Sequence, residues 1–410
     1  MSEINETISR QIASIVTEDI DLEQRKVIPE PSEFWKKLKN CGTEIWLDTG
    51  DIEEASAIWT SEMMGLTTNN TLLNKEIQKG IYDSFIEKAN KLLKNLDISQ
   101  RILEIAFILN ARHGLILSKI FGCKVSVELH TDLAHNLQGI IDYGHRFYSI
   151  NPDRFIVKVP YTPTGLLGAR KLTDAGIPVN FTLGFSARQN LFATLIAQPN
   201  FVNVFLGRIG AYFKSNQLGD GKYSGEKTTH ATQKIVKKYG KDKTRLIAAS
   251  IRSADQLELL AGTNVFTIPT SVAKEAVNTL GGNFVPQTNS NYQIILMENV
   301  NPDSVKADKL WNISDEELRL ALNLSEKLPS SGNELEEKAR KYGCGDMFPE
   351  LSESEKAIIS NDGKIPVHKT WADKITQGNL AIDTLLNLAG LASFTSDQSE
   401  LDKRIEGIIK

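Results

Sequence analysis

The chain alternates short apolar runs with longer amphipathic stretches. Eight of the short runs are rich in Val, Ile, Leu, Phe or Thr, a pattern that predicts strands buried on both faces. These runs lie at residues 44–49, 64–69, 124–129, 154–159, 178–183, 201–206, 245–250 and 264–269. Helical patterns lie between them, which is typical of parallel β/α architecture. Eight such units in about 230 residues match the size of a (β/α)8 TIM barrel.

An open, doubly wound sheet is the competing arrangement of the same elements. That fold commonly carries a glycine-rich G-x-G-x-x-G loop after its first strand, where it binds phosphate. The chain has no such loop after residues 44–49, and its absence favours the barrel.

The helical stretches carry their own signals. The stretch at about 74–120 predicts two helices, and the last stretch, 376–410, predicts a helix pair or one broken helix. Several residues are of the types that cap helix N-termini. The predicted caps are Asp51, Asp132, Thr164, Ser186 and Ser253.

Four regions follow from these patterns. Residues 1–42 predict an N-terminal helical extension, and residues 43–284 predict the barrel. The polar and charged residues 285–375 predict a helical insertion of unknown role, and residues 376–410 predict a C-terminal helix that packs on the barrel.

Composition narrows the function classes. Of 410 residues, 41% are hydrophobic and 24% are charged, so a large core is possible. A net charge of −4 gives no basic surface for nucleic acid or membrane. The three cysteines form no CxxC pair, the N-terminus lacks a signal-peptide pattern, and no apolar run is long enough to span a bilayer. We expect a cytoplasmic protein; a homo-oligomer is compatible with the sequence.

Polar side chains stand inside or just after most of the predicted strands. Active sites of (β/α)8 barrels lie at the carboxyl ends of the strands, so these residues are the candidates for chemistry. They are Asp48, Asn69, Glu128, Lys158, Asn180, Thr182, Asn203, Ser250, Arg252 and Thr267.

Lys158 is the most informative of them, because it lies within the apolar run FIVKVP. A lysine in such a place must reach water, pair with a carboxylate, or be held as a neutral amine. A neutral amine can attack a carbonyl and form a Schiff base. A structural ion pair with Asp48 or Glu128 explains the local sequence equally well.

Asp48 and Glu128 have similar alternatives. Asp48 can serve as a strand-end turn residue or as a catalytic carboxylate, and Glu128 within VSVEL must be paired or functional if it is buried. Arg208 and Arg252 follow the sixth and seventh strands, where barrels commonly bind phosphate. Surface salt bridges are the alternative for the two arginines.

The histidines carry less information. His130 and His135 flank Asp132, but their spacing does not place them on one helix face, so we expect no metal. His230 and His368 lie in polar stretches and are expected to be solvated.

Around these residues the sequence resembles the transaldolase family, within the Schiff-base aldolases. The similar stretches fall in order at successive strand ends and cover most of 43–280, resuming near 376. They are residues 47–52, 65–69, 125–129, 156–172, 179–186, 205–213, 248–262 and 394–410.

The resemblance implies transfer of a dihydroxyacetone unit between sugar phosphates, within the pentose phosphate pathway and without a cofactor. It implies that Lys158 forms the Schiff base, that Asp48 is the acid/base, and that Glu128 and Thr182 hold a catalytic water. The implied substrate-binding residues are Asn69 and Asn180 at the dihydroxyacetone unit, Arg208, Ser250 and Arg252 at the phosphate, and Phe205 with Asn203 in the pocket.

Three positions depart from the family pattern. Asn70 replaces a proline, His130 replaces an aspartate, and Asn203 replaces a serine. A lyase resembling fructose-6-phosphate aldolase is one alternative, although Glu128 and Phe205 stand where such aldolases carry glutamine and tyrosine. A transaldolase for a non-standard ketose, motivated by Asn203 and residues 285–375, is another. A non-catalytic sugar-phosphate-binding protein is the third.

Overall fold

The computed structural model describes residues 6–18, 20 and 26–410. Its centre is a closed barrel of eight parallel strands in the order β1 to β8, so the predicted barrel is confirmed. The strands are β1 (Glu44–Asp48), β2 (Met63–Thr67), β3 (Lys124–Glu128), β4 (Phe155–Pro160), β5 (Val179–Thr182), β6 (Phe201–Phe205), β7 (Arg245–Ala249) and β8 (Val265–Pro269). Every predicted run overlaps one strand.

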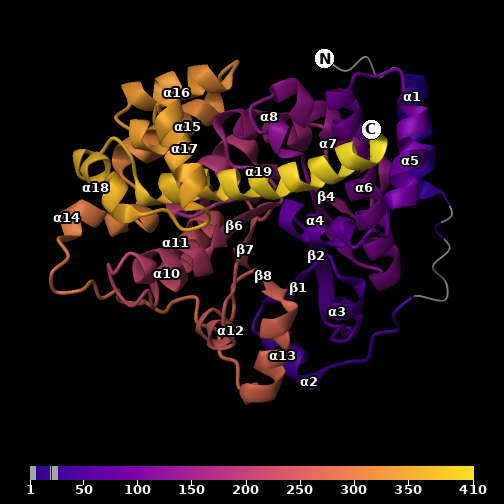
Figure 1. The fold of residues 1–410 in the computed structure, drawn as a ribbon. Coiled ribbons are helices and arrows are strands. Elements are labelled where there is room, and N and C mark those ends of the chain that lie inside the picture. The colour runs from indigo at the N-terminus through magenta and orange to yellow at the C-terminus, as the bar shows by residue number, and fades with distance from the viewer. Residues whose placement is uncertain (1–5, 19, 21–25) are drawn as a thin grey trace.

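Helices surround this barrel (Figure 1). Those within the barrel's sequence are α3 (Ile52–Ser56), α4 (Asn70–Gln78), α5 (Asp83–Leu92), α6 (Ile98–Phe121), α7 (Leu137–Ile150), α8 (Pro163–Asp174), α9 (Ala187–Phe192), α10 (Leu206–Ser215), α11 (Ser224–Tyr239), α12 (Asp255–Leu259) and α13 (Thr270–Thr279). The stretch predicted as two helices thus holds α5, α6 and the end of α4. A π-helical turn, Ala193–Ala197, extends α9.

Two helices, α1 (Glu6–Thr17) and α2 (Glu33–Asn40), precede the barrel. The remainder of the predicted extension, at 1–5, 19 and 21–25, lies outside the described residues. In the described part of the chain, no helix is both long enough and apolar enough to cross a membrane.

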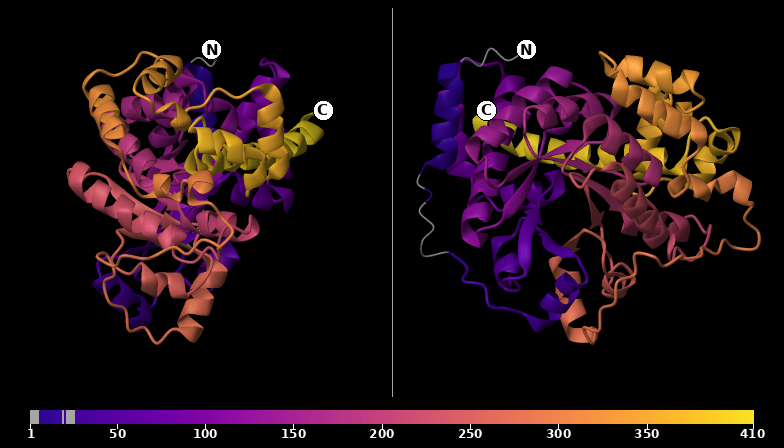
Figure 2. Two further views of the ribbon diagram at one scale, coloured as in Figure 1. Left: turned by 90° about the vertical axis from the view of Figure 1, so that its left-hand side faces the viewer. Right: turned by 180° about the vertical axis from the view of Figure 1, so that it is seen from behind.

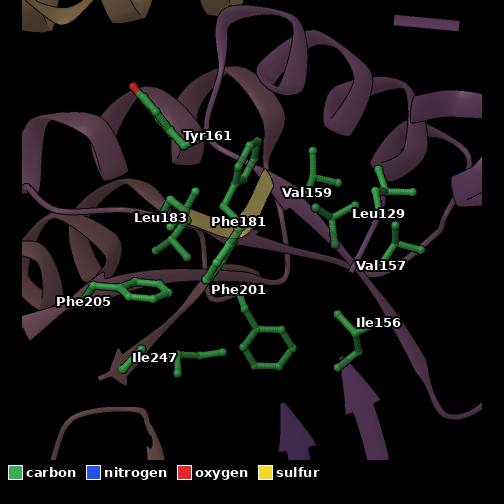
Figure 3. Close-up of a cluster of buried hydrophobic side chains, with 14 of the residues drawn as sticks. Leu129, Ile156, Val157, Val159, Tyr161, Phe181, Leu183, Phe201, Phe205 and Ile247 are labelled. Atoms are coloured by element: carbon green, nitrogen blue, oxygen red, sulfur yellow. The ribbon is translucent and has the colours of Figure 1, made fainter. Parts of the chain in front are cut away.

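The barrel interior is filled by large side chains. Trp46 of β1 and Phe201 of β6 meet edge to face, with ring centroids 5.0 Å apart. Gly65 of β2 makes room for Trp46, since a Cβ at residue 65 would lie 2.6 Å from the indole ring. Figure 3 shows Phe201 beside Ile156 and Ile247, which come from three different strands. This packing fills the interior of the barrel, and a cavity opens at its carboxyl end.

The chain beyond β8 adds a second group of helices. It comprises α14 (Pro302–Val305), α15 (Asp315–Glu326), α16 (Gly332–Lys341), α17 (Glu353–Asp362), α18 (His368–Gln377) and α19 (Ile382–Ile409). Helices α15 to α18 gather at one side of the barrel, and α19 runs from them across the molecule (Figures 1 and 2). Helix α19 is continuous, so the predicted break or pair is wrong.

Side-chain hydrogen bonds hold α19 over the carboxyl end of the barrel. Asn387 donates a hydrogen bond to the carbonyl oxygen of Leu183, directly after β5, over 2.9 Å. Farther along α19, Glu400 accepts a hydrogen bond from Asn74 of α4 over 3.0 Å. The helix therefore forms one wall of the barrel mouth.

Candidate active site

A cavity of about 140 Å³ opens at the carboxyl end of the barrel. Ten of the sequence-predicted candidates line it: Asp48, Asn69, Lys158, Asn180, Asn203, Phe205, Arg208, Ser250, Arg252 and Thr267. Residues from seven of the strands and the loops that follow them therefore converge on one space. Glu128 and Thr182 are not among the lining side chains and lie below the surface of the barrel mouth.

Lys158 and Glu128 occupy paired positions on neighbouring strands β4 and β3. Their side chains are 4% and 3% exposed, and Nζ of Lys158 lies 3.4 Å from Oε2 of Glu128. Nζ also donates a hydrogen bond to the carbonyl oxygen of Thr68 over 2.9 Å. Burial raises the pKa of Glu128, and the nearby Lys158 partly offsets that effect. A buried amine beside a carboxylate of raised pKa can exchange a proton with it.

Asp48 lies at the carboxyl end of β1 and lines the cavity. Its Oδ1 accepts a hydrogen bond from the Thr67 hydroxyl over 2.8 Å, and that hydroxyl lies 2.6 Å from the hydroxyl of Thr267. Burial raises the pKa of Asp48, while Lys158, Thr67 and the arginines of the mouth act in the opposite sense. A carboxylate of this kind can take a proton from a substrate and return it.

On β5, Thr182 and Asn180 each carry one buried polar atom without a hydrogen-bond partner in the described part of the chain. These atoms are Oγ1 of Thr182 and Oδ1 of Asn180, whose amide nitrogen donates to Ser126 over 3.0 Å. Buried polar atoms are nearly always satisfied in proteins, so both are available to bind a ligand or a solvent molecule.

Two of the predicted substrate-binding amides also hold local structure. Asn69 caps α4, because its Oδ1 accepts from the backbone amide of Leu72 over 2.9 Å. Oδ1 of Asn203 accepts from the backbone amide of Gly184 over 3.2 Å, which ties β6 to the turn after β5. Both residues also line the cavity.

Asn70 and His130 are the other two positions that depart from the family pattern. Asn70 is buried at the start of α4, and its backbone amide donates to Glu128. His130 lies outside the cavity, where its Nε2 is 3.2 Å from a carboxylate oxygen of Asp402 on α19.

Positive charge gathers on the β6 and β7 side of the cavity. Arg208, 6% exposed, stands in the first turn of α10, and its Nη1 has no hydrogen-bond partner in the described residues. Burial lowers the pKa of Arg208 to about 10, and the neighbouring Arg252 acts in the same sense. Arg252 is exposed at the rim. Two close arginines without carboxylate partners can bind a phosphate.

Some lining residues were not predicted individually. Thr67 and Phe394 line the cavity, and so does Lys364, which lies in the loop between α17 and α18. The Phe394 ring on α19 lies 5.8 Å from Nζ of Lys158 and 5.5 Å from Cζ of Arg208. A strand-end pattern cannot reveal Phe394 or Lys364, because neither follows a strand.

The prediction that His230 and His368 are solvated is wrong. His230 is 2% exposed and its Nδ1 lies 3.1 Å from the carbonyl oxygen of Ser290; His368 is 6% exposed and its Nδ1 lies 2.6 Å from the Tyr212 hydroxyl. The segment after β8 covers His230, and His368, which lies in that segment, packs against Tyr212 of α10; local polarity could not indicate either contact. No group of three or more His, Cys, Asp or Glu side chains suited to a metal occurs within residues 6–18, 20 and 26–410.

Sequence comparisons connect this site to known proteins. The profile of the Transaldolase/Fructose-6-phosphate aldolase family matches residues 45–319, more than half of the chain. A transaldolase of Xanthomonas campestris pv. campestris (strain B100) is 29% identical over 232 residues, covering 54% of this chain and 71% of the relative. The transaldolase of Saccharomyces cerevisiae (strain ATCC 204508 / S288c) is 28% identical over 256 residues, covering 60% and 75%.

A probable transaldolase of Nitrosopumilus maritimus (strain SCM1) is 29% identical over 232 residues, covering 56% of this chain and 85% of the relative. The family profile extends across all eight strands whose ends form the cavity. The chain therefore belongs to the Transaldolase/Fructose-6-phosphate aldolase family and is an enzyme of the transaldolase type.

Proposed function

We propose that this enzyme transfers a dihydroxyacetone unit from a ketose phosphate to an aldose phosphate through a Schiff base on Lys158. The observation that carries the proposal is the setting of Lys158. Its amine lines the mouth cavity, lies 3.4 Å from the Glu128 carboxylate, and shares the cavity with Asp48. An amine and two carboxylates are the groups that imine formation and carbon–carbon cleavage require.

The first half-reaction begins when the neutral amine of Lys158 attacks the ketone carbon. The carbinolamine loses its hydroxyl as water, with the proton delivered from Glu128 through a water that Thr182 also holds. The raised pKa of Glu128, which burial causes, favours the protonated carboxyl that this step needs. The product is a protonated imine on Lys158.

Cleavage then follows on the other side of the cavity. Asp48 takes the proton of the hydroxyl on the fourth carbon, and the bond between the third and fourth carbons breaks. The electron pair moves into the imine and gives an enamine, while the aldose leaves as an aldehyde. An acceptor aldehyde reverses these steps with the proton held by Asp48, and water then releases the new ketose from Lys158. The imine serves as the electron sink, so this route uses no metal or organic cofactor.

A direct test of the covalent step is reductive trapping with dihydroxyacetone. The full chain is incubated with dihydroxyacetone and borohydride, digested, and mapped by mass spectrometry. We expect the added mass on Lys158 and none after Lys158→Ala. Lys171, in the last turn of α8, is the internal control and should stay unmodified. Trapping that persists in Lys158→Ala would refute the mechanism.

Transfer and simple cleavage are separated by product analysis. With fructose 6-phosphate as donor, free dihydroxyacetone accumulates in a lyase regardless of the acceptor. In a transferase, turnover depends on an added aldose phosphate such as erythrose 4-phosphate. The sequence resemblance favours transfer, because Glu128 and Phe205 stand where the related aldolases carry glutamine and tyrosine.

A further inference from the structure

Two lining residues of the cavity, Lys364 and Phe394, lie outside the residues that the family profile matches, and Lys364 is the charged one. Lys364 follows α17, well beyond residue 319, and its side chain is exposed at the mouth. No ion pair or hydrogen bond of its amine occurs among the described residues. The chain after the barrel thus returns to the active site and adds a free positive charge to it.

The loop that carries Lys364 is fixed in place. Asn216, directly after α10, donates to the carbonyl oxygen of Pro366 over 3.0 Å and accepts from the backbone amide of His368 over 2.8 Å. The Tyr212 hydroxyl on α10 lies 2.6 Å from Nδ1 of His368. Within the loop, Asp362 accepts from the backbone amide of Val367 over 2.9 Å.

These contacts couple Lys364 to Arg208. Arg208 stands in the first turn of α10, and Tyr212 lies one turn later on the same helix. A single helix therefore sets the position of the arginine and anchors the loop with the lysine.

The positive charges that line the cavity favour an anionic ligand. Arg208, Arg252 and Lys364 line one cavity, and none of them forms an ion pair within the described residues. The buried Nη1 of Arg208 has no hydrogen-bond partner there either, although such a group is ordinarily satisfied. Lysine acts as a point charge on a flexible stem, which suits contact with a doubly charged group at the rim of a site.

We propose that Lys364 is a substrate-binding residue that selects substrates with a terminal phosphate, which it contacts together with Arg208 and Arg252. The identity of the substrate as a phosphorylated sugar rests on the proposed function. The binding of a phosphate dianion by these three cations does not depend on it.

The first experiment measures phosphate binding without catalysis. Titration of the full chain with inorganic phosphate by calorimetry should show about tenfold weaker binding in Lys364→Gln, since hydrogen bonds to charged groups contribute on this scale. Lys364→Arg should restore most of the affinity. Lys369→Gln is the matched control, because Lys369 is an exposed lysine nearby that does not line the cavity. Equal affinity in Lys364→Gln and the unaltered chain, or equal losses in the two Gln variants, would overturn the proposal.

The second experiment uses the reaction. With fructose 6-phosphate, Lys364→Gln should raise KM about tenfold and leave kcat nearly unchanged, because the contact is remote from the reacting carbons. Reductive trapping with unphosphorylated dihydroxyacetone should proceed at the unaltered rate. A loss confined to kcat would contradict a role in phosphate binding. If Lys158 is never trapped while Lys364 still governs phosphate affinity, the proposed function fails and this inference stands.

Discussion

At the scale of single residues, the electrostatics of Asp48 offer a measurable consequence. Burial raises the pKa of its carboxyl, and the positive charges of Lys158, Arg252 and Arg208 pull it back. As a base, Asp48 must be ionised, so activity should fall on the acid side as it becomes protonated. We expect the midpoint of this acid limb in kcat to lie above the ordinary value of about 3.9 for aspartate.

Arg252→Gln should move that limb to higher pH. Removing a cation that favours the ionised carboxylate raises the pKa of Asp48 further, so protonation inactivates the enzyme earlier as the pH falls. The kcat–pH profile at saturating substrate measures the shift. Arg245→Gln is the control: Arg245 begins the same strand, β7, but pairs with Glu44 at the opposite end of the barrel over 2.6 Å. A shift toward lower pH, or an equal shift in both variants, would contradict this account.

The cavity residues that lie on strands could be predicted from the sequence, because a strand alternates its side chains between two faces. Once the strands were located, Asp48, Lys158 and Asn180 had to point into the same barrel mouth. Lys364 and Phe394 reach that mouth from helical segments far along the chain, and no local pattern marks them. The burial of His230 and His368 could not be predicted for the same reason, because it comes from contacts between the barrel and the chain that follows it.

At the scale of elements, the proposed phosphate site depends on a close approach between the start of α10 and the loop after β7. A Cβ on Gly207 would lie 2.1 Å from the carbonyl oxygen of Ser250 and 2.5 Å from Cγ of Arg252. Ser250 itself has a φ of 61°, a left-handed conformation that few side chains adopt readily. The starts of α10 and of the loop after β7 therefore touch, which brings Arg208 and Arg252 together.

Gly207→Ala should push the start of α10 away from the loop after β7. The steric conflict is expected to destabilise the protein by about 1–3 kcal/mol and to raise KM for phosphorylated substrates. Thermal unfolding and initial rates at several substrate concentrations measure the two effects. Gly407→Ala is the matched control, since a Cβ at this position in α19 meets nothing within 4 Å. Unchanged KM in a folded Gly207→Ala variant would show that the contact does not organise the site.

Predictions of strands were more accurate than those of helix ends. Asp51 and Ser186 cap α3 and α9 as predicted, but Thr162 rather than Thr164 caps α8. Asp132 lies inside a short 3-10 turn, and α12 begins after Ala254 without a cap from Ser253. A cap must meet a backbone amide two or three positions later, so a shift of one residue removes it, whereas a buried strand tolerates such shifts in its bounds.

At the scale of the whole molecule, one buried ion network joins the barrel to the helices that follow it. Arg188 of α9 is fully buried, and its guanidinium reaches Glu317 of α15 and Asp346 at 2.7 and 2.8 Å. It also reaches Asp383, near the start of α19, at 2.8 Å, and Lys309 adds a contact to Glu317 at 3.1 Å. The sequence could not predict this network, because the carboxylates that pair with Arg188 lie 129 to 195 residues from it along the chain.

Arg188→Met should destabilise the fold in a pH-dependent way. Burial favours protonation of Asp383 and Glu317, but Arg188 outweighs it and the pKa of each carboxyl is lowered. Groups with lowered pKa stabilise the folded state above their unfolded pKa of about 4, and that contribution is lost as the pH falls. Without Arg188, Lys309 still contacts Glu317 and Asp346, but Asp383 keeps no ion pair among the described residues. Removing one partner of a buried pair costs about 3–5 kcal/mol near neutral pH.

Acid relieves that penalty in the variant, because its carboxyls then bind protons and bury no charge. The difference in unfolding free energy between Arg188→Met and the unaltered chain should therefore shrink from pH 7 toward pH 4, as measured by urea unfolding. Arg170→Met is the matched control, since Arg170 is an arginine of the neighbouring helix α8 that pairs with the exposed Asp174. The difference in unfolding free energy between Arg170→Met and the unaltered chain should be small and nearly independent of pH. A penalty for Arg188→Met that stays constant or grows toward pH 4 would mean that packing, and not charge, makes this arginine necessary.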